Sequence, residues 1–260
     1  MISIAVLSSV FRLQQLDDLL KLLPKNQEIF VVYDDIKPVR CDIDYIVVKR
    51  RGRFYCRADV WHAAVNRANY DRILLLDGDR VPHPDFITHI INDSSSDLIH
   101  YPTSIINLGN GYKPCDIITA FTLSPDEHRL IAGSEAIGPR RNPMSGCVSF
   151  TKSSYHKWGG MSPEFVGWGF NDIDCYCKAL KADCKFMGHM LPEVHLYHDY
   201  EVSRFIFMMM NAYNGVKFYH KWCLSIHPLI LGTMEKFNCT VYDALNLSLS
   251  AFIEKASMRC

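Results

Sequence analysis

The chain has 260 residues, of which 48% are hydrophobic and 22% are charged, a balance typical of soluble globular proteins. Twenty-eight Lys and Arg residues against 28 Asp and Glu residues give no formal net charge. Because no global positive field attracts a polyanion, this balance disfavours non-specific nucleic-acid binding. The aromatic share of 12% disfavours a disordered chain.

The ten cysteines are scattered, and no C-x-x-C pair indicates a zinc site. We therefore expect free thiols in a reducing compartment. The first residues lack the basic region and the small-residue cleavage site of a signal peptide. No apolar run approaches the roughly 20 residues of a membrane-spanning helix. These features predict a cytoplasmic protein without a transmembrane segment and leave peripheral membrane contact open.

The first 80 residues alternate between short apolar runs and amphipathic segments. Leucines three and four residues apart predict a helix over 12–24, and the spacing of Ala, Val and Trp predicts another over 57–69. Runs typical of buried strands cover residues 2–8, 28–35, 44–50 and 71–79. This alternation predicts an α/β fold with a mostly parallel sheet flanked by helices.

Residues 92–145 lose this alternation, because stretches such as NDSSSD and NLGNGYKP predict turns and long loops. Segments 146–152 and 185–198 are strand-like, and 172–183 predicts a helix. From residue 204 onward the pattern is helical. The sequence thus predicts one α/β domain with a helical C-terminal extension.

Asp77 and Asp79 directly follow the apolar run that predicts the fourth strand. Ligands of open α/β sheets bind beyond the carboxyl ends of the strands. Buried carboxylates there are costly unless a cation pairs with them, and their oxygens suit Mg²⁺ or Mn²⁺, which bind phosphate. The pattern therefore favours a metal–phosphate site over a solvated Asp-Gly turn.

Residues 159–174 combine glycines, aromatic residues and two aspartates. The glycines permit close backbone approach to a ligand, and the aromatic rings offer flat faces for a sugar ring. Trp168 is then either a ligand contact or a core residue. Asp172 and Asp174 stand where a helix begins, so Asp172 is either a functional carboxylate or a helix cap.

Two stretches, LLLDGDRVPHPDFI and SGCVSFTKSSYHKWGGMSPEFVGWGFNDID, resemble GT-A glycosyltransferases, in particular the β-1,4-galactosyltransferase and chondroitin-synthase-like group. The residues in matching places are Gly146, Gly160, Phe165, Gly167, Trp168, Gly169, Asp172 and Asp174. The chain departs from this pattern at Phe170, Asn171 and Ile173, and Asn171 replaces a Glu that contacts the acceptor sugar in the family.

The resemblance implies a GT-A, Rossmann-like domain over 1–200, with a nucleotide-binding half in 1–80 and an acceptor and catalytic half in 81–200. A helical extension over 201–260 is expected to pack on the same domain. The implied activity is metal-dependent transfer of a sugar from a UDP-sugar to a hydroxyl of a glycan or glycoconjugate, with inversion. A nucleotidyltransferase, a phosphatase or an inactive sugar-binding module remain alternatives.

The resemblance also implies roles for single residues. Nucleotide or donor contacts are expected at Ser8, Asp34, Asp35, Arg57, Asp77 and Gly160. Acceptor contacts are expected at Trp168, Asn171 and Asp174, and the catalytic base at Asp172. The basic run 49–53 is a candidate diphosphate contact, although such runs are more often solvated loops.

The metal, Mn²⁺ or Mg²⁺, is expected at Asp79 and His195, with Asp77 as a further candidate and His198 as the second choice. A histidine ligand would favour Mn²⁺ over Mg²⁺. Because the two histidines are three residues apart on a predicted strand, we expect them on opposite faces and not on one ion.

Overall fold

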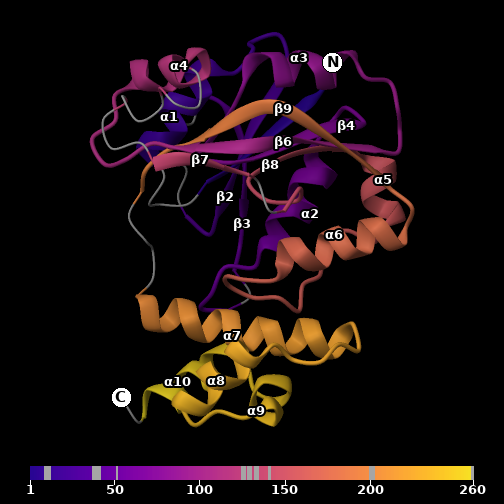
Figure 1. Ribbon diagram of the computed structural model, residues 1–260. Helices are drawn as coiled ribbons and strands as arrows, with labels where there is room; N and C mark the ends of the chain where they lie inside the picture. The colour runs from indigo at the N-terminus through magenta and orange to yellow at the C-terminus, as the bar shows by residue number, and fades with distance from the viewer. Residues whose placement is uncertain are drawn as a thin grey trace.

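The computed structural model describes the chain except residues 9–12, 37–41, 51, 124–126, 128–130, 132–134, 140–141, 199–202 and 259–260 and the side chains of 13–14 and 135–139. A sheet lies between two layers of helices, and the last four helices gather on one side of this unit (Figure 1). Among the described residues, no helix is long and apolar enough to cross a membrane.

The strands run in the order β3-β2-β1-β4-β8-β6-β9-β5, and β7 pairs with β6. Their bounds are β1 Ser3–Ser8, β2 Glu28–Asp34, β3 Asp44–Val48, β4 Arg72–Asp77, β5 Arg80–Pro82, β6 Leu98–Asn107, β7 Glu135–Pro139, β8 Cys147–Thr151 and β9 Lys185–His195. Strands β1 to β4 pair in parallel, as predicted. Beyond β4 the sheet is mixed, because β8 pairs antiparallel with β4 while β6 and β9 pair in parallel.

Helices cover both faces of the sheet and form the C-terminal extension. They are α1 Leu13–Leu22, α2 Arg57–Arg67, α3 Pro84–Asn92, α4 Pro114–Thr122, α5 Lys152–Lys157, α6 Asn171–Lys181, α7 Arg204–Lys221, α8 Pro228–Lys236, α9 Val241–Asn246 and α10 Leu249–Ser257. The prediction of turns and long loops over 92–145 is wrong for β6, α4 and β7. Strand β6 carries Pro102 and several polar residues, and its pairing with β8 and β9 compensates for this weak local pattern.

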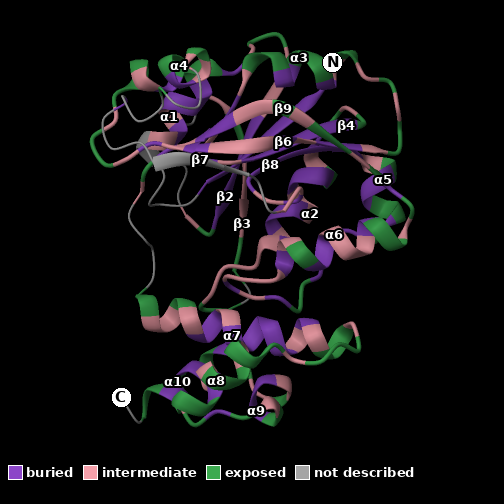
Figure 2. Cartoon of the chain, viewed as in Figure 1, coloured by how far each residue is buried: buried purple, intermediate pink, exposed green. Residues whose placement is uncertain are grey.

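Alternating side chains of the buried strands divide the core into two clusters. On β4, Leu74 and Leu76 pack into one cluster, while Ile73 and Leu75 pack into the other. Buried residues accordingly concentrate in the sheet and on the inner sides of the helices (Figure 2). Asp77 follows Ile73 and Leu75 in this alternation, so its side chain lies on the face of the sheet that α2 covers.

The C-terminal helices contribute a third cluster, which includes Met209, Val216 and Phe252. Val166 and Trp168, from the loop before α6, pack against it. The extension therefore has its own core and touches the aromatic and glycine-rich segment. All cysteines that the structure describes are free thiols, as expected.

Candidate active site

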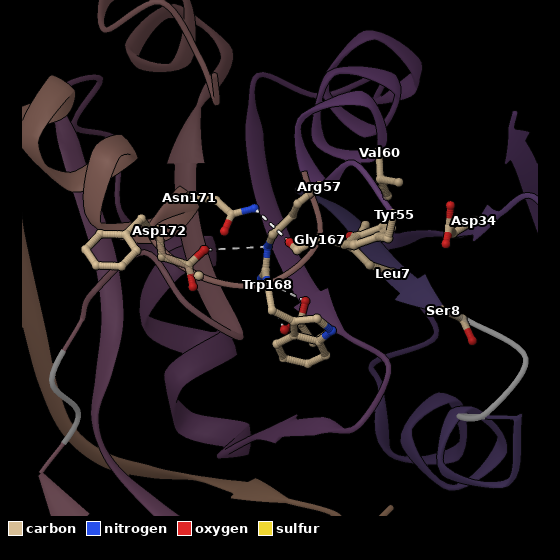
Figure 3. A pocket seen from close by; sticks show the side chains of 13 residues that line it. Leu7, Ser8, Asp34, Tyr55, Arg57, Val60, Gly167, Trp168, Asn171 and Asp172 are labelled. Carbon is tan, nitrogen blue, oxygen red and sulfur yellow. Dashed lines mark hydrogen bonds and ion pairs between the residues drawn. The ribbon is translucent and has the colours of Figure 1, made fainter. Parts of the chain in front are cut away.

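A pocket opens where the carboxyl ends of β1 and β4 meet the start of α2 and the loop before α6 (Figure 3). It is lined by Leu7, Ser8, Asp34, Tyr55, Arg57, Val60, Asp77, Gly167, Trp168, Gly169, Phe170, Asn171 and Asp172. Seven of these positions were candidates from the sequence: Ser8, Asp34, Arg57, Asp77, Trp168, Asn171 and Asp172. The fold thus brings together residues from two distant parts of the chain.

Arg57, the first residue of α2, connects two acidic side chains of this pocket. Its Nη2 donates to both carboxylate oxygens of Asp77, at 2.9 and 3.1 Å, and its Nε lies 3.6 Å from Oδ1 of Asp172. Burial opposes the charge of Arg57, but the two carboxylates outweigh it and raise the pKa of the guanidinium. One fixed cation therefore serves both carboxylates.

Asp172 does not occupy the cap position of α6. The helix begins at Asn171, and its N-cap is Phe170, which has a left-handed φ of 64° and makes no side-chain cap hydrogen bond. Asp172 instead directs its carboxylate toward Arg57 (Figure 3). Its side chain keeps 25% of its exposure, so solvent or a ligand can reach it.

A second cluster lies around Asp79, which is almost fully buried. Nε2 of His198 is 2.8 Å and Nε2 of His195 is 3.3 Å from Oδ2 of Asp79. The expectation that the two histidines lie on opposite faces is therefore wrong, and their ligand atoms are close enough to hold one ion together with Asp79. Strand β9 ends at His195, so the chain leaves the extended geometry before it reaches His198.

The residues around His195 fit a divalent cation. Oδ1 of Asn107 lies 3.0 Å from Nδ1 of His195 and can only accept, so Nδ1 carries the proton and Nε2 presents its lone pair. If Nε2 were protonated, it would donate a hydrogen bond to Asp79. Burial nevertheless lowers the pKa of His195, so the charged form of the ring is disfavoured. A divalent cation held by Nε2 and the carboxylate would remove this conflict, and the two imidazoles favour Mn²⁺ over Mg²⁺.

Asp34 and Asp35 end β2 in different surroundings. Asp34 is buried and accepts two bonds from Nε of Arg50, at 3.0 and 2.9 Å, so Arg50 from the basic run serves as its partner. Asp35 has a left-handed φ of 51°, lies 3.3 Å from Nζ of Lys49 and is not among the residues that line the pocket. Arg51 falls outside the described residues.

Two further candidates face the core. A Cβ at Gly160 would lie 2.7 Å from the ring of Tyr155, so close side-chain packing accounts for this glycine. Asp174 is fully buried, accepts from Ser162 Oγ at 2.6 Å and Trp222 Nε1 at 2.9 Å, and pairs with Lys221. Neither Gly160 nor Asp174 is among the residues that line the pocket, and the contacts that the structure shows for both are internal.

Sequence reasoning missed Tyr55 and Asn107. Tyr55 lines the pocket two residues before Arg57, and its position in RFYCRA was a usable signal. Asn107 ends β6, in a segment predicted as loop, and no local pattern points to it.

Part of the chain matches a known protein family. Residues 134–205 match the protein family described as the N-terminal domain of galactosyltransferase, and this segment contains the Gly-Trp-Gly loop, α6 and His195. No curated protein sequence matches the chain.

Among solved structures, GalNAc-T7 with UDP, GalNAc and Mn²⁺ superposes with a TM-score of 0.54 at 11% identity, over 99% of this chain and 56% of that chain. This chain therefore spans just over half the length of that structure, and the likeness shows the fold. The expected GT-A architecture is confirmed.

Two further solved structures superpose less well. The mannosyltransferase PcManGT of Pyrobaculum calidifontis, in complex with GDP-Man and Mn²⁺, gives a TM-score of 0.49 at 12% identity, over 99% of this chain and 73% of that one. A Drosophila β1,4-galactosyltransferase 7 mutant in complex with manganese, UDP-Gal and xylobiose gives a TM-score of 0.42 at 17% identity, over 72% of this chain and 65% of that one.

Proposed function

We propose, from the premise that this chain has the GT-A fold and a galactosyltransferase-type segment over 134–205, that the protein is a metal-dependent glycosyltransferase. The donor is a UDP-sugar, and the acceptor is a hydroxyl of a glycan or glycoconjugate. Transfer proceeds with inversion at the anomeric carbon.

One observation carries this proposal: the two aspartates at the end of β4 serve different clusters. Asp79 faces His195 and His198, which together form a candidate metal site. Asp77 faces Arg57, which also reaches Asp172. A candidate metal site beside a pocket with its own carboxylate fits the transfer of a sugar from a nucleotide.

Asp79, His195 and His198 would hold the ion, and the two imidazoles favour Mn²⁺ over Mg²⁺. When bound, the ion would supply Lewis-acid stabilisation of the departing diphosphate. Asn107 keeps the Nε2 lone pair of His195 directed at the site.

The remaining residues act on the nucleotide and the acceptor. Ser8, Asp34 and Asp77 bind the nucleoside at the strand ends, and Arg57 holds Asp77 in place. Trp168 and Asn171 line the acceptor side, where the indole ring excludes water from the reacting carbon. Asp172 takes the proton from the acceptor hydroxyl as that oxygen attacks the face opposite UDP.

Asp172→Asn tests the proposal, because Asn cannot take the proton. We expect a folded variant with unchanged UDP affinity and transfer slowed by about 10² to 10⁴. The matched control is Asp183→Asn, at an exposed left-handed residue just beyond the other end of α6, where Asn is well tolerated. The assay follows UDP release from a panel of UDP-sugars, with and without Mn²⁺ and acceptor glycans.

Wild-type turnover by Asp172→Asn, or a product with retained configuration, contradicts the assigned base and stereochemistry. Hydrolysis of p-nitrophenyl phosphate without UDP release indicates a phosphatase instead. Glycan binding without UDP release from any donor indicates a sugar-binding module.

A further inference from the structure

Asn214 of α7 is fully buried and contacts the backbone of the loop that carries Trp168. Its Nδ2 donates to the carbonyl oxygens of Val166 and Trp168, each at 2.9 Å. Buried carbonyl groups are costly when they lack a donor. A single amide thus satisfies two carbonyls on either side of Gly167 and fixes the path of the chain between them.

The glycines of this loop, residues 166–170, make room for α7. Gly167 and Gly169 both have left-handed φ values, 73° and 99°. A Cβ at Gly167 would lie 2.7 Å from Sδ of Met210, and one at Gly169 would clash with Asn211. Met210 is one helical turn before Asn214, so the same side of α7 makes both sets of contacts.

The same helix also holds the other side of Asp172. At the C-terminal end of α7, Nζ of Lys221 lies 2.9 Å from Oδ1 of the buried Asp174, and Nε1 of Trp222 donates to that oxygen. Two anchors from the C-terminal extension therefore flank the segment 168–174, which supplies Trp168 and Asp172 to the pocket.

From these contacts we infer that α7 fixes the acceptor side of the pocket, with Asn214 as a positioning residue that acts through Trp168. The Oδ1 of Asn214 has no hydrogen-bond partner among the described residues, so the donor end of the amide makes the contacts that matter. An Asp at this position keeps the shape but loses both donors and directs oxygen atoms at two carbonyls.

The first test is hydrogen exchange of the full-length chain, which needs no substrate. Asn214→Asp should accelerate exchange in peptides that cover 165–172 while peptides from β1 and β4 stay protected. The matched control is Asn246→Asp in α9, an exposed amide that donates to the carbonyl of Tyr242. Unchanged loop exchange, or uniform loosening of the whole chain, overturns the inference.

Asn214→Ser keeps a hydroxyl donor and serves if Asn214→Asp does not fold. The same loop-selective acceleration, smaller in size, is expected. If both variants unfold, a purely structural role suffices and the inference is overturned.

The second test rests on the proposed function. We expect KM for the acceptor to rise by about tenfold to a hundredfold, because small misplacements of positioning groups have effects of that order. Affinity for UDP with Mn²⁺ should stay unchanged. In a double-mutant cycle, Asn214→Asp should add little to Trp168→Ala, since both act on one contact.

Additive effects in that cycle, or equal losses of donor and acceptor binding, contradict action through Trp168. If the wild-type protein uses no UDP-sugar, the proposed function fails, while hydrogen exchange still decides whether Asn214 positions the loop.

Discussion

Arg57 and Asp172 face each other across the pocket, with Nε of the arginine 3.6 Å from Oδ1 of the aspartate. The same guanidinium donates to Asp77 at the end of β4. Residues 115 positions apart in the chain, 57 and 172, are thereby linked to the strand end through one buried cation. The donor side and the candidate catalytic base depend on the same side chain.

Removing this cation should damage both stability and activity. Arg57→Met keeps much of the apolar stem but leaves Asp77 and Asp172 without their shared partner. Breaking such a pair in a largely buried setting destabilises by about 3 kcal/mol. We expect a lower urea midpoint, weaker UDP binding and little transfer. Arg57→Lys should keep only part of the stability and the activity, because the ammonium group of Lys lacks the planar pair of donors of a guanidinium. Wild-type stability and UDP affinity of Arg57→Met would contradict the bridging role.

The metal site is tested by measuring Mn²⁺ binding directly, with electron paramagnetic resonance as the readout. Asp79→Asn should remove the Mn²⁺ dependence of UDP binding and abolish turnover. His198→Ala should weaken Mn²⁺ affinity, because its Nε2 lies 2.8 Å from Oδ2 of Asp79. His156→Ala, at an exposed residue of α5, is the control. Near-native activity of Asp79→Asn in EDTA would refute the assignment.

Trp168 lines the pocket and also contacts the ring of Phe207 at a centroid distance of 6.1 Å. Trp168→Ala should reduce acceptor use far more than it lowers the melting temperature, if the indole packs on a sugar ring. The measurement pairs acceptor KM with a thermal melt. A large fall in melting temperature with unchanged kinetics in the folded fraction would indicate a core residue instead.

A group of hydrogen-bonded histidines that does not line the pocket predicts that the protein is sensitive to acid. Nε2 of His189 lies 2.9 Å from Nδ1 of His100, and Nε2 of His100 lies 2.8 Å from Asp93. Burial, together with His100 and His89, lowers the pKa of His189 from 6.5 to about 4. The folded protein binds a proton at His189 less readily than the unfolded chain does. The free energy of unfolding is therefore highest above pH 6.5 and decreases as the pH falls toward 4.

His189→Leu should therefore flatten the fall in urea midpoint between pH 6.5 and 4, because the titrating group is gone. His156→Leu should leave the slope as it is in the wild-type protein. An unchanged slope in His189→Leu would show that other groups dominate acid unfolding.

Some of the site follows from local patterns alone. The apolar run before Asp77 predicts a buried strand, and parallel strands place ligands beyond their carboxyl ends, so the acidic pair was expected at the site. The helix expected over 172–183 and most of the strand expected over 185–198 likewise follow from local sequence patterns, although the strand ends at His195. These features depend on interactions between residues that are near in sequence, and the local pattern of side chains therefore predicts them.

What the sequence determined by itself is therefore the positions of the strands over 2–79 and their mostly parallel pairing, the strand end that carries Asp77 and Asp79, and the segment that carries Trp168 and Asp172. Tertiary structure decided which groups meet. Pairing of β5 with β9 sets Arg80 opposite His195 and brings Asp79 to both histidines. Packing of α7 buries Asp174 and takes it away from the pocket. These outcomes depend on pairing across more than a hundred residues or between separate helices, and no local periodicity records which distant partner a side chain finds.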